Sequence, residues 1–349
     1  MKILHFYRNA CEFLKEQPFF PYFFSTPGFS AEICDYRPPE ERSSKAPLPA
    51  PAQTVSDMEA LPSCVDESQA GILQCHDLPL LEPVLKSAKA GTLPVIFSAY
   101  RSLSDELISG WRQYAALFQE LQACFVPSEE LENFLKQSLP ALPVFRFPER
   151  IESHYAFKAG SASTSPLRFA VLISEKNPKY VENIHGALAK VMITGKSFDI
   201  VWICFEPKMK RDIIKDVESR GLSPFVQVND LEDFPLAVYD GLITDGNLNK
   251  AYTPGQYFHL LLSAIKAGKL LITENEPHMD DILIHGTTAL VIPDFSSNKL
   301  GHLIHFLISF REEVDKICES ARVFYESRET IPVLQGRLQK AYREILSEA

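Results

Sequence analysis

The chain repeatedly alternates short apolar runs with longer segments of helical periodicity, and this alternation limits the fold more than any other feature. In the first half, the apolar runs are 2–7, 71–75, 93–100, 123–128 and 143–147. The helical segments between the later runs are 77–91, 104–121 and 129–137. Strands and helices joined by short connections favour a parallel sheet covered by helices on both faces. The first half therefore predicts an α/β domain.

A second alternation of the same kind follows in the second half. Its apolar runs are 167–173, 199–205, 224–228, 239–244, 269–273 and 289–293. Its helical segments are 179–193, 208–220 and 256–267, and helices continue from residue 298 to a last one at 335–347. Ligands of such sheets bind beyond the carboxyl ends of the strands, where helices begin. We therefore expect a second parallel α/β domain with its own ligand edge.

A length of 349 residues also favours two domains of about 150 residues each. We place the first domain at 1–157, a small and polar linker at 158–166, the second domain at 167–330 and a C-terminal helix at 331–349. Residues 38–70 are rich in Pro, Ser and charge, so we expect a long surface loop or disordered insertion there.

Composition excludes several classes of function. A net charge of -10 and no run of Lys or Arg argue against nucleic-acid binding, which needs clustered cations. The start of the chain has no signal-peptide pattern, and no apolar run is long enough to span a membrane. The seven Cys are scattered without a CxxC pair, which indicates buried, reduced thiols in a cytoplasmic protein. Association with the inner face of a membrane stays open.

Three segments, in order, carry a resemblance to a known family. They are GILQCHDLPLLEPVLKSAKAGTLPVIFSAYRS (71–102), GQYFHLLLSAIKAGKLLIT (255–273) and DDILIHGTTALVIPD (280–294). Together they resemble the retaining glycosyltransferases of family four, which have the GT-B fold. The resemblance covers most of the chain. It implies two Rossmann-like parallel-sheet domains facing a cleft, with a C-terminal helix that crosses back to the first domain.

The resemblance also implies which residues form the site. His76, at a strand end immediately before a helix, is the expected catalytic residue in contact with acceptor or sugar; the alternative is a His satisfied by local backbone. Lys179, with Lys176 as the alternative, is expected to meet the diphosphate, unless it is an ordinary surface lysine. The other positions expected at the donor are Arg8, Gly255, Gln256, Ser263, Asp281, His285 and Gly286. The pair His285-Gly286 either offers a backbone N–H to the ligand or simply turns the chain.

The sequence departs from the family at the positions of two carboxylates. The E-x7-E pair, which contacts sugar and ribose, falls on Gly255 and Ser263. Two lost charge-assisted hydrogen bonds would cost roughly 3–6 kcal/mol of donor binding. The Arg that follows the first strand of the second domain is missing, and 7–10 (YRNA) replaces the Gly-rich loop after the first strand. Arg8 is therefore a candidate phosphate contact, and Tyr100 stands where the family often has a His.

The resemblance implies an enzyme that works by electrostatics and needs no cofactor metal. Our first hypothesis is a hexosyltransferase that uses a nucleotide sugar and a glycan or lipid-linked acceptor. The second is a degenerate GT-B protein that binds a glycan or a partner glycosyltransferase without turnover. The aromatic run at 19–24 is either core or a lip for an apolar acceptor.

Overall fold

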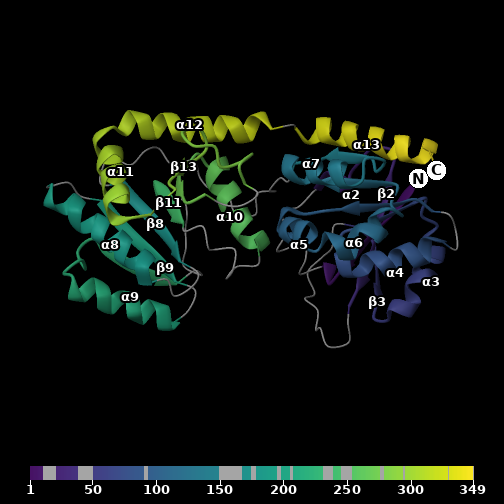
Figure 1. Ribbon diagram of the computed structural model, residues 1–349, viewed down its shortest axis with the longest axis horizontal. Helices are drawn as coiled ribbons and strands as arrows, with labels where there is room; N and C mark the ends of the chain where they lie inside the picture. The colour runs from purple at the N-terminus through teal and green to yellow at the C-terminus, as the bar shows by residue number, and fades with distance from the viewer. Residues whose placement is uncertain are drawn as a thin grey trace. The chain divides into compact units, whose positions relative to one another are not determined.

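The chain folds into two compact units, of which each is described by itself (Figure 1). The first unit is made of Met1–Glu152 and Glu329–Ala349, and the second of Ser153–Arg328. The computed structural model describes residues 1–10, 21–37, 50–89, 93–148, 167–173, 178–194, 198–204, 207–230, 239–244, 254–275, 279–293, 295–328 and 330–348. Both units contain a parallel sheet, so the predicted two-domain α/β architecture is confirmed.

The first unit is built on a seven-stranded sheet with the order β3-β2-β1-β4-β5-β6-β7. Its strands are β1 (Lys2–Arg8), β2 (Ser30–Tyr36), β3 (Ala52–Val55), β4 (Ile72–Cys75), β5 (Val95–Ser98), β6 (Ala123–Val126) and β7 (Val144–Arg146). All neighbouring strands pair in parallel. The order runs one way from β1 to β3 and the other way from β4 to β7. The strand order therefore reverses between β1 and β4, and ligands of such sheets bind at the carboxyl edge beside a reversal of this kind.

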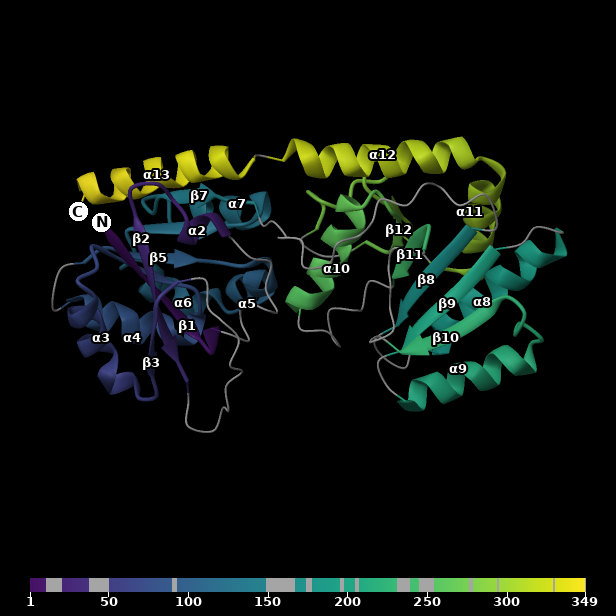
Figure 2. The same ribbon diagram turned by 180° about the vertical axis from the view of Figure 1, so that it is seen from behind.

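Helices cover both faces of this sheet (Figure 1, Figure 2). The helical elements are α2 (Pro21–Phe24), η1 (Met58–Ala60), α3 (Leu61–Ser68), α4 (Leu78–Lys89), η2 (Arg101–Leu103), α5 (Ser104–Ser109), α6 (Trp111–Phe118), α7 (Glu129–Ser138) and α13 (Ile331–Glu348). In both views α3, α4 and α6 lie on one face, and α2 and α13 lie on the other. The sheet is therefore the middle of three layers.

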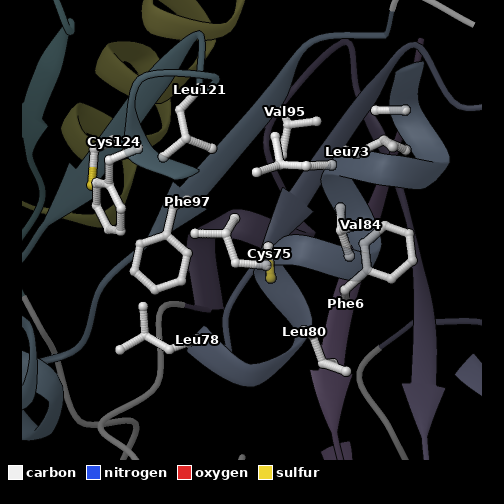
Figure 3. Packing of buried hydrophobic residues seen from close by; sticks show 14 of the residues in the cluster. Phe6, Leu73, Cys75, Leu78, Leu80, Val84, Val95, Phe97, Leu121 and Cys124 are labelled. Atoms are coloured by element: carbon white, nitrogen blue, oxygen red, sulfur yellow. The ribbon is translucent and has the colours of Figure 1, made fainter. Parts of the chain in front are cut away.

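The face under α3 and α4 carries the larger core (Figure 3). Phe6 of β1, Leu73 of β4 and Phe97 of β5 are fully buried there, against Leu80 and Val84 of α4. Alternate residues of each strand point to this face because the side-chain period of a strand is two. Each such side chain contributes about 1.5–3 kcal/mol on burial, which makes this layer the main stabilising contact of the first unit.

The opposite face is closed by α13, whose residues lie far along the chain from the sheet. Leu338 and Tyr342 of α13 are fully buried against this face. The Tyr342 hydroxyl donates to Gln74 Oε1 at 2.5 Å, and Gln74 Nε2 donates to Ser98 Oγ at 2.6 Å. This buried polar chain ties the helix to β4 and β5. The expectation that a C-terminal helix returns to the first domain is confirmed.

Local sequence explains where α7 begins and ends. Ser128 caps the helix, because its hydroxyl accepts a hydrogen bond from Leu131 N–H at 3.3 Å. Three glutamates occupy the first turn, and Lys136 lies in the last turn, so both charges suit the helix dipole. Leu131 and Leu135, four residues apart, are fully buried and attach the helix to the sheet.

The second unit has a six-stranded parallel sheet with the order β10-β9-β8-β11-β12-β13. Its strands are β8 (Leu167–Ile173), β9 (Phe198–Cys204), β10 (Val226–Asp230), β11 (Gly241–Thr244), β12 (Leu270–Thr273) and β13 (Leu290–Val291). The direction of strand succession reverses between β8 and β11. The second unit therefore has the same kind of switch point as the first, again at the carboxyl edge.

The helices of the second unit are α8 (Pro178–Ile193), α9 (Pro207–Ser219), α10 (Pro254–Lys266), α11 (Ser297–Ser309) and α12 (Arg311–Ser327). Helices α8, α9 and α11 share one buried core with β8 and β9, whose largest member is Trp202. The helix expected near 256–267 is confirmed as α10, and its Leu261, Ala264 and Ile265 are fully buried. None of the helices described here is long and apolar enough to cross a membrane.

Two expectations about the first unit are wrong. Residues 38–70 are not one long loop, because β3, η1 and α3 lie within this range; residues 38–49 fall outside the described residues. The helix expected at 104–121 is divided into α5 and α6 at Gly110. A Cβ at Gly110 would lie 2.8 Å from the Glu106 carbonyl oxygen, so the break depends on glycine.

The aromatic run at 19–24 contributes to the core through Phe23. This side chain is 2% exposed and packs with Phe125 and Phe147 on the α13 face of the sheet. Residues 19 and 20 lie outside the described residues.

Candidate functional site

His76 directly follows β4 at the switch point of the first sheet, and it is fully buried. Its Nδ1 lies 3.0 Å from the Tyr100 hydroxyl, and its Nε2 lies 3.0 Å from His5 Nδ1. The ring stacks on Tyr7 with a centroid distance of 4.2 Å and an interplanar angle of 9°. Both ring nitrogens are therefore occupied by side chains, not by the local backbone that the sequence suggested as the alternative.

Burial keeps this histidine pair neutral. It lowers the pKa of His5 to about 3, and burial together with the neighbouring His5 places the pKa of His76 well below its usual range. His5 Nε2 is buried and has no hydrogen-bond partner among the residues that the structure describes. Because each partner of His76 can donate or accept, two opposite proton arrangements fit the same heavy atoms. In either arrangement, the chain of hydrogen bonds ends at His5.

The turn after β1 binds a carboxylate from the neighbouring strand β2, that of Asp35. Asn9 has a positive φ of 49°, which asparagine tolerates better than other residues with a Cβ. Ala10 N–H donates to Asp35 Oδ1 at 2.7 Å, and Arg37 Nε donates to Asp35 Oδ2 at 2.6 Å. Asp35 is fully buried, so these partners offset the cost of its charge. Arg8 is half-buried at the end of β1 and interacts with neighbouring residues.

Lys179 lies at the switch point of the second unit. It is the second residue of α8, the helix that follows β8, and its side chain is exposed. It has no ion-pair or hydrogen-bond partner among the described residues. A cation at a helix N-terminus opposes the helix dipole by a few tenths of a kcal/mol unless an anion lies nearby. Lys176, the alternative, lies outside the described residues.

The segment from Met279 to Val291 is a turn held by its own hydrogen bonds. Gly286 has a φ of 75°, and its N–H donates to the Ala289 carbonyl at 2.8 Å. His285 is exposed, and its Nδ1 lies 3.0 Å from the Val291 carbonyl oxygen, which can only accept. The buried Thr288 hydroxyl accepts from Ile284 N–H and donates to the Ile282 carbonyl. Gly286 therefore serves the turn, and His285 Nε2 has no hydrogen-bond partner among the described residues.

The remaining donor positions differ in exposure. Gly255 and Gln256 lie in the first turn of α10, and their side-chain surroundings fall outside the described residues. Ser263 is 2% exposed within α10. Asp281 is half-buried and already interacts with a neighbour.

The structure thus places His76 and Arg8 at the first switch point and Lys179 at the second. Sequence reasoning missed two polar residues of this site, His5 and Asp35. The signal for His5 was a polar residue inside an apolar run, whereas Asp35 lies in β2, which the apolar pattern did not predict. Tyr100 was noted as a substitution and is found hydrogen-bonded to His76. Within the described ranges, no group of three or more His, Cys, Asp or Glu side chains could hold a metal ion.

No protein-family model and no curated protein matches the sequence. Solved structures match along its whole length. A glycosyltransferase from Rickettsia africae ESF-5 is 11% identical with a TM-score of 0.67, and the match covers 100% of this chain and 99% of that one. HepE from Anabaena in complex with UDP is 12% identical with a TM-score of 0.68, over 99% of this chain and 100% of that one. Sucrose-phosphate synthase from Thermosynechococcus elongatus is 10% identical with a TM-score of 0.65, over 100% of both chains.

The TM-scores and the coverage of both chains establish the fold. The strand orders, the two switch points and the matched lengths agree, and the chain has the GT-B glycosyltransferase fold.

Proposed function

We propose that this GT-B chain transfers a hexose from a nucleotide sugar to a hydroxyl group of a glycan or lipid-linked acceptor. The departing nucleoside diphosphate binds at the carboxyl edge of the second sheet, where α8 begins after β8. The acceptor is oriented at the carboxyl edge of the first sheet, near Arg8.

The observation that carries the proposal is Lys179. An exposed lysine without a described partner, at the start of a helix and at a topological switch point, suits a diphosphate. The α8 N-terminus adds its free backbone N–H groups and the positive end of its dipole. Together they supply the neutralisation that a leaving diphosphate requires.

The structural relatives support the same class of donor. HepE has been solved with UDP-glucose, and this chain matches that complex with a TM-score of 0.61 at 11% identity. A UDP-sugar is therefore the first donor to try, and GDP-sugars are the natural comparison.

The test measures nucleotide affinity by calorimetry with UDP and GDP. Lys179→Ala should weaken binding about 10- to 150-fold, the equivalent of one charge-assisted hydrogen bond of 1.5–3 kcal/mol. Lys190→Ala is the matched control, because Lys190 is an exposed lysine near the other end of α8 whose Nζ donates to Asn298. Wild-type protein that binds neither nucleotide at millimolar concentration would refute the proposal.

A second function is favoured by the burial of His76 at the first switch point. Both ring nitrogens of this fully buried histidine are hydrogen-bonded to other side chains. In addition, Gly255 and Ser263 replace the two glutamates of the E-x7-E pair. These features suit a subunit that binds a nucleotide, glycan or partner without turnover. Release of UDP from a UDP-hexose in the presence of acceptor separates the two: a transferase releases it, and a binding subunit does not.

A further inference from the structure

Two thiols from different elements of the first unit are in contact inside its core. Cys34 of β2 is 0% exposed and Cys64 of α3 is 4% exposed. Both belong to the core cluster beneath α3 and α4, and their side chains share a hydrogen bond. They lie 30 positions apart in the sequence, so nothing in the spacing reveals the pair (64 − 34 = 30).

The other described cysteines of this core have different partners. Cys75 Sγ donates to the Asp77 carbonyl at 3.2 Å, and Cys124 Sγ lies 3.9 Å from the Phe125 carbonyl oxygen. Both are fully buried in the same cluster as the pair. Cys75 and Cys124 are therefore matched in burial and differ in lacking a neighbouring thiol among the described residues.

The two elements differ in how firmly they are held. Cys34 lies in a strand paired on both sides, in register with Phe6 of β1 and Gln53 of β3. Cys64 lies in the eight-residue helix α3, whose N-cap makes no side-chain hydrogen bond. A bonded pair of sulfurs is about 2.05 Å apart, so thiols in contact need mainly side-chain rotation and a small shift of the helix to join.

We propose that Cys34 and Cys64 form a reversible intramolecular disulfide that links β2 to α3. Cys64 is the attacking sulfur, because it is the more exposed of the two thiols and the hydrogen bond from Cys34 lowers its pKa. The same hydrogen bond, with burial, raises the pKa of Cys34, which keeps its proton until the second step.

Hydrogen peroxide is the oxidant, since it is small enough to reach a thiol that is 4% exposed. The Cys64 thiolate attacks one peroxide oxygen, the O–O bond breaks, and Cys64 becomes a sulfenic acid while hydroxide leaves. The Cys34 sulfur then attacks the Cys64 sulfur, and the hydroxyl group leaves with the Cys34 proton as water. Two thiols are oxidised and one peroxide is reduced to two waters. A dithiol reductant reverses the reaction by thiol–disulfide exchange.

The link lies close to the candidate site, because Asp35 directly follows Cys34 and accepts the Ala10 N–H of the turn after β1. Oxidation therefore fixes α3 to the strand whose end supports that turn.

The test treats the folded, full-length chain with peroxide and then counts thiols in denaturant. The titre should fall from seven to five, because one disulfide consumes two thiols (7 − 2 = 5). Non-reducing digestion and mass spectrometry should recover a peptide joining Cys34 to Cys64 that is two hydrogens lighter, and dithiothreitol should remove it.

Two variants make the result specific. Cys64→Ser should abolish the link and leave Cys34 as a free thiol, whereas Cys124→Ser should leave both the link and its yield unchanged. A titre that stays at seven in folded wild-type protein overturns the proposal, and so does a link that joins either cysteine to a third one. The wild-type measurement decides the matter even if a variant fails to fold.

Discussion

Each unit holds a fully buried histidine with both ring nitrogens bonded, yet the two are determined to different degrees. In the second unit, Trp202 Nε1–H donates to His185 Nε2 at 3.1 Å, and His185 Nδ1 lies 2.5 Å from Asp216 Oδ2. An indole N–H can only donate and a carboxylate can only accept, so His185 has one tautomer, with its proton on Nδ1. In the first unit, Tyr100 and His5 can each donate or accept a hydrogen bond, so two tautomers of His76 are possible.

The difference shows what a buried histidine is useful for. His185 joins α8, β9 and α9 through partners of fixed direction, which is a structural role. Burial lowers its pKa despite the raising effect of Asp216, so it stays neutral. The His5–His76–Tyr100 chain ends at His5 Nε2, which has no hydrogen-bond partner among the described residues. Such a chain can reverse the direction of its protons without moving an atom heavier than hydrogen.

The largest expected effect comes from replacing each ring by one without nitrogen. His76→Phe keeps the stacking on Tyr7 but removes one hydrogen bond from the Tyr100 hydroxyl and one from His5 Nδ1, at a cost of about 2–5 kcal/mol of unfolding free energy. His185→Phe should cost about 1–3 kcal/mol, because Asp216 keeps Arg220 and part of its exposure to water.

Urea unfolding followed by tryptophan fluorescence measures both variants. Each unit holds one of the two tryptophans, Trp111 and Trp202, so Trp111→Phe and Trp202→Phe backgrounds report the units separately. The comparison rests on the idea that partners able both to donate and to accept, such as Tyr100 and His5, lose more when the histidine ring is removed. If His76→Phe cost no more unfolding free energy than His185→Phe, that idea would be wrong.

The next effect is the contribution of His5 to the pH dependence of stability, beside that of His76, whose pKa is also lowered by burial. The pKa of His5 is about 3 in the folded chain because of burial, against 6.5 for a free histidine. Between these values the unfolded chain binds more protons, so the unfolding free energy falls as the pH falls from 6.5 towards 3. The slope is about 1.4 kcal/mol per pH unit for one such group.

His5→Phe should lower the slope of unfolding free energy against pH by about 1.4 kcal/mol per pH unit in the first unit. This holds whatever the substitution does to stability at neutral pH. Unfolding at pH 7, 6 and 5, values on either side of about 6.5, provides the measurement, with Trp111 as the probe. An unchanged slope would show that His5 is protonated in the folded chain or accessible to water.

The smallest effect tests the exposed end of the His185 network. Arg220 Nε donates to Asp216 Oδ2 at 2.9 Å, and the two side chains are 40% and 30% exposed. Exposed pairs of this kind contribute less than about 1 kcal/mol. Arg220→Ala should therefore lower the unfolding free energy of the second unit by less than about 1 kcal/mol, and less in high salt. A larger loss would mean that Arg220 helps to orient His185.

The alternation of apolar runs was sufficient to predict both sheets and most helices, because buried parallel strands have an almost continuous apolar sequence. It failed at β2, whose sequence SAEICDY carries two acids, and at β3, which lies in the range expected to be a loop or insertion. In the structure Glu32 accepts hydrogen bonds from Lys2 and Gln53 on the neighbouring strands, and Asp35 supports the turn after β1. Those partners become visible only once the strand order is known.

The site shows the same limit. The position of His76 after a strand followed from the sequence, but its contacts with His5 and Tyr100 depend on the register of three strands. Likewise, the substitution of Ser263 for a glutamate was visible in the sequence, whereas its burial on α10 was not. A motif fixes where a residue falls along the chain, and the packing of remote elements fixes what it can reach.

The return of α13 to the first unit has a consequence for how the chain is made. Leu338 and Tyr342 are translated after the whole second unit, yet they cover a face of the first sheet. A ribosome adds about 5–20 residues each second, so that face waits many seconds for its helix. During this time the apolar residues of the sheet are exposed, and closing the layer requires contact across more than 200 residues of sequence (Tyr342 to Gln74 spans 268). The first unit to be translated is therefore the last to be completed.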